Sequence, residues 1–141
     1  MTYCPQCGSR LAPKLVDETN RLVCPHETCG FVHWDNPIPV VAALVLYHDH
    51  SLIARPAGWP NGLFSLITGY LARNEPPEHA VVREVLEELG VRRLVTRHIG
   101  NYAFIKKSQL ILGYDIVASG TLAVHDELVE LRHLSPAELA Q

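Results

Sequence analysis

Residues 69–91 read GYLARNEPPEHAVVREVLEELGV, and the second half of this stretch has the periodicity of an amphipathic helix. Its apolar residues recur at spacings of three and four, so we expect them to form one stripe that faces a core. These residues are Val81, Val82, Val85, Leu86 and Leu89. Pro76 and Pro77 mark a start and Gly90 marks a stop. The pattern therefore predicts a helix of about three turns over residues 76–89.

Three glutamates, Glu84, Glu87 and Glu88, are expected to project side by side from the opposite face of this helix, where like charges repel. Arg83 is placed to reach Glu87 and leaves the other two uncompensated, and the small Ala80 is expected to leave open space above the carboxylates. A solvated acidic face is one interpretation. The other is a site for a divalent cation of the magnesium kind, which binds one or two carboxylates and keeps waters that substrate phosphates displace.

The same stretch resembles the Nudix box, in which a glycine and a glutamate precede the pattern Arg-Glu-aliphatic-any-Glu-Glu-any-Gly-aliphatic at fixed spacings. The matching residues are Gly69, Glu75, Arg83, Glu84, Val85, Glu87, Glu88, Gly90 and Val91. The resemblance implies a hydrolase that uses Mg²⁺ or Mn²⁺ held by Glu84, Glu87, Glu88 and the carbonyl of Gly69. It also implies that Glu75 positions its loop by pairing with Arg83.

The chemistry expected of such a site follows from charge. A diphosphate linkage is negatively charged and resists attack by water, so its hydrolysis needs cations that bridge its oxygens and a base that accepts a proton from water. We expect Glu84 to bind metal and Glu87 or Glu88 to share the role of base. Arg83 is included in the catalytic set because it is expected to orient the carboxylates by hydrogen bonding.

Length, composition and charge set wider limits on the chain. Its 141 residues, 48% of them hydrophobic, suffice for one ordinary domain with an appendage. The net charge of −3, without runs of like charge, makes a nucleic-acid partner or an anionic membrane an unfavourable interpretation. The longest apolar run, residues 40–46, is too short to span a bilayer, and the N-terminus lacks a signal-peptide pattern. We therefore expect a cytoplasmic protein.

All four cysteines lie near the N-terminus, at Cys4, Cys7, Cys24 and Cys29, and a glycine follows the second member of each pair. Two such turns bearing four thiolates are typical of a tetrahedral zinc site. Two disulfides are the alternative, which a reducing compartment disfavours. His26 lies inside the wider second pair and competes as a ligand, but we expect Cys29 because its glycine repeats the first turn. Zinc would then stabilise a ribbon too small to fold on its own core.

The ribbon is expected to contain a hairpin of residues 14–16 and 21–23, with a turn over residues 17–20. A structural or dimerising role is favoured over nucleic-acid binding, since the ribbon has few cations. A proline-containing linker ends it, and we expect Trp34 there to pack between the two modules. A zinc ribbon followed by a Nudix domain is similar to NADH pyrophosphatases and to the ribbon-bearing Nudix hydrolases of FAD or ADP-ribose. We place the ribbon at residues 1–36 and the Nudix domain at residues 37–141.

The remainder of the chain alternates β-rich runs with turns. Strands are expected at residues 40–47, 52–55, 63–68, 94–104, 109–118 and 128–134. Ser135 and Glu138 form a capping box around Pro136, which predicts the start of a short second helix. Strands and helices interleaved in this way are typical of the α/β class, and we expect an α/β/α sandwich with a mixed sheet.

Three further residues are candidates for the site, the first of them implied by the resemblance. Glu127 is similar in order and spacing to a downstream metal ligand of NADH pyrophosphatases, and Asp126 or Glu130 could replace it. Tyr102 and Phe104 are candidates for stacking on adenine, with core packing as the alternative.

Substrate identity is the least determined property. NADH pyrophosphatases carry the signature Ser-Gln-Pro-Trp-Pro-Phe-Pro-any-Ser-Leu-Met after the box, whereas residues 100–111 here read GNYAFIKKSQLI and lack its tryptophan and prolines. NAD(H), ADP-ribose and FAD all remain candidates as small-molecule nucleotide substrates, and a homodimer is compatible with the resemblance. RNA bearing an NAD cap is a further candidate for a relative of these enzymes, although the lack of a basic face argues against tight RNA binding. The alternative function is a nucleotide-binding Nudix sensor or adaptor that does not cleave, with the ribbon as its partner surface.

Overall fold

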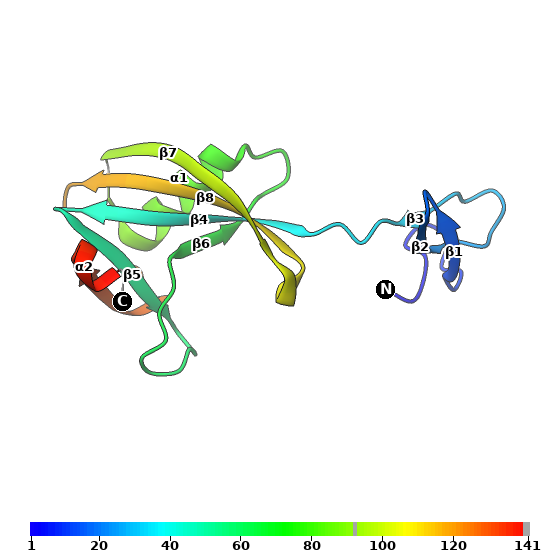
Figure 1. The fold of residues 1–141 in the computed structure, drawn as a ribbon, viewed down its shortest axis with the longest axis horizontal. Coiled ribbons are helices and arrows are strands. Elements are labelled where there is room, and N and C mark those ends of the chain that lie inside the picture. Colours follow the sequence, from blue (N-terminus) through cyan, green and yellow to red (C-terminus); the bar gives the residue numbers. More distant parts are fainter. Residues whose placement is uncertain (92, 140–141) are drawn as a thin grey trace. The chain divides into compact units, whose positions relative to one another are not determined.

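The structure is a computed structural model that describes residues 1–91 and 93–139. The chain divides into two units, Met1–Pro37 and Ile38–Gln141. Figure 1 shows short strands in the first unit, and a larger sheet with its helices in the second.

The first unit is an antiparallel sheet with the order β1 (Ala12–Val16), β2 (Thr19–Val23) and β3 (Val32–His33). β1 and β2 form the predicted hairpin, but only Asp17 and Glu18, both with positive φ, separate them. Because a two-residue turn lets strands pair up to its tip, β2 starts two residues earlier than predicted. β1 also starts two residues earlier, where Ala12 and Pro13 pair with Val23 and Leu22. The buried residues of this unit are Cys4, Leu11 and Cys24. A core of this size needs an additional crosslink to be stable.

The second unit is built on one mixed sheet of six strands (Figure 1). The strands are β4 (Ile38–Tyr47), β5 (His50–Pro56), β6 (Ile67–Tyr70), β7 (Arg93–Phe104), β8 (Gln109–Ser119) and β9 (Leu128–Leu134). Their hydrogen-bonded order is β7-β8-β4-β5-β9, and β6 pairs with β4. β4 and β8 are parallel, whereas the other pairs among the described strands are antiparallel. The predicted mixed sheet is therefore confirmed.

The way the central strand β4 pairs with its neighbours leaves a cleft in the sheet. One of its edges pairs with β8 along its whole length. Its other edge pairs first with β6, at residues 40–43, and then with β5, at residues 45–47. β5 leaves β4 after Leu52 and continues along β9. β5 and β6 therefore diverge from one shared edge, and a cleft lies between them.

The expected helix is present as α1 (Pro77–Leu89), within one residue of its predicted start. Gly90 adopts a left-handed φ of 66°, and its N–H donates to the carbonyl of Leu86, which ends the helix as the sequence indicates. The helix buries Ala80, Val81, Val85 and Leu89 against the sheet. Leu86 was expected on this stripe, but its side chain is 40% exposed because it lies at the outer edge of the helix.

The strand expected at residues 63–68 is displaced toward the C-terminus. β6 occupies Ile67–Tyr70, and before it only Ser65 forms a bridge, to Ala54 of β5. Gly62 has a φ of 83°, and the Leu63 N–H donates to the carbonyl of Pro60, so the chain is still turning at residue 63. This shift carries Gly69 into the strand itself rather than leaving it after the strand.

The C-terminal helix α2 (Pro136–Leu139) is a single turn that contacts β5 and β9. The Ser135 N–H and hydroxyl both donate to the Glu138 carboxylate, which confirms the predicted capping box. The α/β/α arrangement is thus present with its second helical layer reduced to one turn. Among the described residues, no helix has both the length and the apolarity needed to cross a membrane.

Candidate active site

The carboxylate of Glu84 lies against Gly69 of β6. A Cβ atom added to Gly69 would lie 1.9 Å from Glu84 Cδ, which is far inside van der Waals contact. The Glu84 side chain is only 15% exposed, and Glu88 is half-buried. Our prediction that these glutamates lie on the face opposite the apolar stripe was therefore wrong. Glu84 follows Val81 by three residues, as Glu88 follows Val85, and residues so spaced share one side of a helix.

Ala80 does not provide the open space predicted above the carboxylates. Its side chain is fully buried in the hydrophobic core between α1 and the sheet. The room for Glu84 comes instead from the missing side chain of Gly69. A glycine and a glutamate distant in sequence therefore depend on each other sterically.

Arg83 connects α1 to the loop that precedes it. Its Nε and Nη2 donate to the two carboxylate oxygens of Glu75, at 2.8 and 3.0 Å, which is a bidentate pair. Its Nη1 donates to Glu84 Oε1 at 2.7 Å and to Glu87 Oε2 at 3.1 Å, and Nη2 also donates to the carbonyl of Tyr70. The expectation that Arg83 leaves Glu84 uncompensated was wrong. All the hydrogen bonds that Arg83 donates in the described structure therefore go to protein groups, and its role in catalysis stays a prediction.

Glu75 pairs with Arg83 as the resemblance implied. The hydrogen bonds from Arg83 lower the pKa of Glu75 from 4.5 to about 2, and the N–H of Ala72 contributes through a further hydrogen bond of 2.8 Å. Glu75 therefore remains ionised at neutral pH and fixes the loop between β6 and α1.

Glu88 has a contrasting environment. Among the described residues it forms no ion pair. Burial, followed by the negative charges of Glu84, Glu127 and Glu87, raises the pKa of Glu88 from 4.5 to about 7. A cation placed among these carboxylates would oppose that shift. Glu88 is thus the carboxylate of α1 whose charge most needs compensation.

The segment between β8 and β9 attaches to the C-terminal end of α1. The N–H of Ala123 donates to the carbonyl of Leu89, and the N–H of His125 donates to the carbonyl of Glu88, both at 2.9 Å. These carbonyls are among those that a helix leaves without an internal partner. The attachment places His125 and Glu127 in a pocket of about 400 Å³ with the glutamates of α1. Its lining is Glu84, Glu87, Glu88, His125 and Glu127.

His125 was missed by the sequence reasoning. No motif marks it, and its place at the site depends on the hydrogen bond to the end of α1.

A second pocket, of about 390 Å³, lies in the cleft between β5 and β6. Its lining comprises Ala54, Pro56, Ala57, Ser65, Leu66, Thr68, Glu88, Glu127 and Leu128. Glu88 and Glu127 line both pockets, so the two spaces meet at these carboxylates. A ligand that occupies the cleft would therefore present one end to the acidic cluster.

Of the three downstream acids considered, the structure brings only Glu127 to these pockets among the described residues. Glu130 instead pairs with Arg55 at 3.2 Å and with Arg132 at 3.0 Å, and these hydrogen bonds lower its pKa. Asp126 lines neither pocket. The choice between them follows from the loop conformation, which the sequence alone does not reveal.

The donor set fits a hydrated divalent cation. Carboxylate oxygens are the preferred ligands of Mg²⁺, which retains several waters. Within the described part of the chain, only the cysteine cluster brings three or more potential ligand atoms within 4.8 Å of one another. The glutamates share a pocket of about 400 Å³ without such close approach, a spacing that suits an ion bound partly through water.

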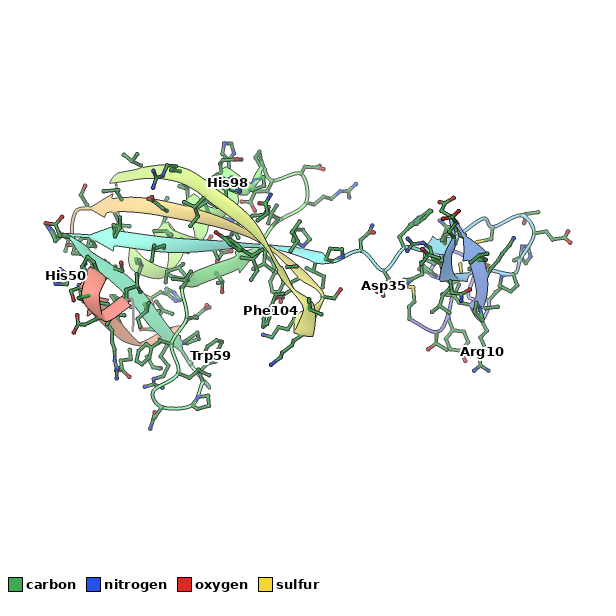
Figure 2. The ribbon with its side chains drawn as sticks, in the orientation of Figure 1. Arg10, Asp35, His50, Trp59, His98 and Phe104 are labelled. Atoms are coloured by element: carbon green, nitrogen blue, oxygen red, sulfur yellow. The ribbon has the colours of Figure 1, made fainter. Side chains whose placement is uncertain are left out.

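Tyr102 and Phe104, the candidates for stacking on adenine, line neither pocket. The Tyr102 ring lies over two glycines: a Cβ at Gly100 would lie 2.9 Å from its hydroxyl oxygen, and one at Gly113 would lie 3.0 Å from its Cε2. Phe104, labelled in Figure 2 near the end of β7, has the Lys107 ammonium 5.9 Å from its ring centroid. Their contact with substrate stays a prediction.

The four cysteines converge in the first unit. All four Sγ atoms lie within 4.8 Å of one another, with 3.5 Å between Cys4 and Cys29 and 3.4 Å between Cys7 and Cys24. A disulfide needs about 2.05 Å between sulfurs, whereas four thiolates around zinc lie roughly 3.8 Å apart. His26 is outside this cluster, and its Nδ1 lies 3.1 Å from the Thr28 hydroxyl. The cluster has the composition and spacing of a zinc site.

Trp34 packs against Arg21 within the first unit, with the guanidinium carbon 4.9 Å from the ring centroid. Its expected position between the two modules stays a prediction.

Comparisons with known proteins point to one family. A family model described as NUDIX domain matches residues 37–141, and one described as Nudix N-terminal matches residues 2–35. Proteins named NAD-capped RNA hydrolase NudC from Pseudomonas aeruginosa and Stutzerimonas stutzeri are each 30% identical over 129 residues, which is 91% of this chain and 45% of theirs. An NAD-capped RNA hydrolase from Schizosaccharomyces pombe is 37% identical over 105 residues, 63% of this chain and 27% of that protein. The chain spans less than half the length of these relatives.

Solved structures show the same architecture. A NUDIX hydrolase from Nitrosomonas europaea superimposes with a TM-score of 0.80 at 25% identity, covering 98% of this chain and 80% of that one. The ORF135 protein of E. coli gives a TM-score of 0.58 at 29% identity, covering 73% and 76% of the two chains.

Proposed function

Because the chain belongs to the Nudix hydrolase family, we propose that it hydrolyses the diphosphate linkage of a nucleoside-diphosphate compound with Mg²⁺ or Mn²⁺. The leading candidate is a dinucleotide such as NAD(H), with ADP-ribose and FAD as related compounds. The observation that supports this most is the junction of two pockets at Glu88 and Glu127, beside the carboxylates of Glu84 and Glu87.

The residues of the site divide by their contacts. Arg83 holds Glu84 and Glu87 in position. Glu84, Glu87, Glu88, Glu127 and the carbonyl of Gly69 are the proposed ligands of the divalent ion. When bound, this ion would neutralise the linkage's charge and lower the pKa of a bound water. Since Arg83 already engages the Glu87 carboxylate, Glu88 is better placed to accept a proton from that water.

The cleft between β5 and β6 is the proposed place for the nucleoside portion of the substrate. It is lined by alanine, leucine and proline side chains together with Ser65 and Thr68, which suits a largely apolar ring with a few polar atoms. The names of the relatives include NAD joined to RNA, so NAD-capped RNA is also a candidate substrate. Cleavage of this substrate would oppose the unfavourable interpretation that net charge gave to a nucleic-acid partner.

In the N-terminal unit we propose Zn²⁺ bound by Cys4, Cys7, Cys24 and Cys29, where it would crosslink a sheet that has almost no core. We also propose residues 1–36 as the ribbon and residues 37–141 as the hydrolase domain.

A substrate panel tests the activity. The zinc-loaded chain is incubated with NADH, NAD, ADP-ribose, FAD, CoA, nucleoside triphosphates and NAD-capped RNA in the presence of Mg²⁺ or Mn²⁺. We expect cleavage of at least one diphosphate compound into two monophosphate-bearing products, identified by mass spectrometry. Binding of a nucleotide without cleavage of any compound would instead support the sensor alternative.

A further inference from the structure

The first unit contains a polar pocket of about 390 Å³ that belongs to neither metal site. It is formed by Met1, by β2, and by His33 at the end of β3 with the two residues after it. Its polar and aromatic lining includes Thr19, Asn20, Arg21, His33, Trp34 and Asp35. Asp35 is labelled in Figure 2, where the chain leaves this unit. The pocket is formed within residues 1–37 alone.

Arg21 is the cation of this pocket, and part of it lacks a partner. Its Nη1 donates to the carbonyl of Trp34, and its guanidinium carbon lies 4.9 Å from the Trp34 ring centroid. Its Nε is buried and, among the described residues, has no hydrogen-bond partner. An unpaired buried N–H of a charged group is unfavourable. Since the buried Nε cannot reach a ligand, the donor that remains is Nη2, for which the described structure shows no hydrogen bond. A guanidinium N–H of this kind donates to an oxygen of a phosphate or carboxylate.

The charges around Arg21 favour a ligand with one phosphate. Asp35 lines the same pocket, and no ion pair joins it to Arg21 in the described structure. Residues 1–37 carry Arg10, Lys14 and Arg21 against four acidic side chains, so they provide no basic surface for a polyanion. A single phosphate bound to Arg21 avoids repulsion from Asp35 better than a run of phosphates would.

Trp34 supplies the second part of a recognition site. Its side chain is 45% exposed although it is large and apolar. Arg21 occupies one face of the indole, and an exposed aromatic face stacks favourably on a nucleobase. Asn20 adds an amide that can hydrogen-bond to the edge of a base. We propose that this ribbon pocket binds a nucleoside monophosphate, with Arg21 on the phosphate and Trp34 against the base. This proposal does not depend on the hydrolytic function of the other unit.

The experiment uses the full zinc-loaded chain with Trp59→Phe, which leaves Trp34 as its only tryptophan. AMP is titrated without added Mg²⁺ or Mn²⁺, and the fluorescence and indole N–H resonance of Trp34 are recorded. We expect saturable quenching and a shift of that resonance. Absence of both changes at saturating concentrations would overturn the proposal.

Arg21→Gln is the diagnostic variant and Arg10→Gln its matched control, since Arg10 lies on the ribbon outside this pocket. Loss of a charge-assisted hydrogen bond weakens binding by roughly tenfold to a hundredfold, whereas the control should bind as the parent does. Bound zinc is measured in each variant to show that the ribbon is folded. Asn20→Ala provides a second variant that leaves the Arg21–Trp34 contact intact. Equal AMP affinity in Arg21→Gln and Arg10→Gln would contradict the assignment.

Two further ligands define the chemistry. Inorganic phosphate should bind more weakly than AMP, because it has no base to stack on Trp34, and equal affinity would refute the nucleoside part of the proposal. A short RNA with a 5′-monophosphate identifies the source: tighter binding than AMP points to RNA ends, and weaker binding points to the free nucleotide. Because residues 1–37 offer no basic surface for a polyanion, we expect the RNA to bind more weakly than AMP, and tighter binding would contradict the preference for a single phosphate.

Discussion

Replacing Gly69 by alanine should disable the site without unfolding the chain. Gly69 lies in β6 opposite Val41, in an extended conformation that alanine also adopts, so the backbone is not strained. The added Cβ would lie 1.9 Å from Glu84 Cδ, where ordinary contact begins at 3.4 Å. The Glu84 carboxylate must therefore move by about 1.5 Å, since the β6 backbone is fixed by its pairing with β4.

A displacement of this size is large for a carboxylate that is proposed to bind the catalytic cation. Misplacement by about 1 Å costs about a hundredfold in rate, so kcat/KM should fall by about a hundredfold or more. This corresponds to about 2.7 kcal/mol of lost transition-state stabilisation. The displaced carboxylate also leaves its 2.7 Å hydrogen bond to Arg83, which weakens the network that orders Glu87.

A double-mutant cycle isolates this cause. Initial rates on whichever compound the chain cleaves are measured for Gly69→Ala, Glu84→Ala and the double variant, and Mn²⁺ affinity is measured in parallel by electron paramagnetic resonance. If the clash with Glu84 is the whole effect, Gly69→Ala costs nothing further once that carboxylate is absent. Near-normal activity of the Gly69→Ala variant would refute the reasoning. So would a double variant whose rate is reduced by the product of the two single-variant factors.

Three other predictions concern the pH dependence of stability, the zinc site and Glu127. The pKa of Glu75 is lowered from 4.5 to about 2, so its ion pair stabilises the fold above pH 4.5 and this stabilisation is lost as the pH falls toward about 2. The Tm of the Glu75→Gln variant should therefore decline less steeply than the Tm of the parent over this pH range. The Cys24→Ser variant should lose zinc binding and the dispersion of the ribbon's amide signals in NMR spectra, while the amide signals of residues 38–139 stay dispersed. Retained dispersion of the ribbon's signals would count against zinc as its crosslink. The Glu127→Gln variant should bind Mn²⁺ about tenfold or more weakly than the parent, whereas the Asp126→Asn variant should bind Mn²⁺ as the parent does. Equal loss of Mn²⁺ affinity in the two variants would show that Glu127 is not the ligand.

The helix and its limits were predictable because their signals are local. Consecutive prolines, a regular apolar spacing and a glycine in the left-handed conformation each act within one or two turns, and α1 ends where Gly90 indicates. The capping box of Ser135 and Glu138 is local in the same sense. The cysteine pattern was also informative, because four thiolates at these spacings have few arrangements other than a shared metal site.

The orientation of the glutamates was not predictable, because it depends on a contact across the fold. Periodicity separates apolar from polar residues, and it therefore assigned Glu84 to the exposed face. Its actual neighbour is Gly69, and β6 also begins later than its composition suggested. A glutamate turns inward where a glycine on the facing strand leaves room, which no helical pattern encodes.

The loop that completes the site has no sequence signal of its own. Ala123 and His125 are placed by hydrogen bonds to the last carbonyls of α1. Every helix end has such carbonyls, and many segments can satisfy them. Glu130 is held away from the site by Arg55, which lies directly opposite it on β5, and by Arg132, two residues along β9. The resemblance alone singled out Glu127, and the loop conformation places it beside the glutamates of α1; its role as a metal ligand stays a prediction.

The central claim is that the carboxylates of α1 bind a divalent cation that hydrolysis requires. It is tested most directly by measuring diphosphate cleavage against Mn²⁺ or Mg²⁺ concentration for the parent chain and for Glu84→Gln with Glu88→Gln. We predict no cleavage in metal-depleted buffer, saturation as the ion is added, and a loss of about a thousandfold or more, or about 4 kcal/mol, in the double variant at an unchanged Tm. Cleavage that proceeds without divalent ions, or at the parental rate in the double variant, would contradict the claim.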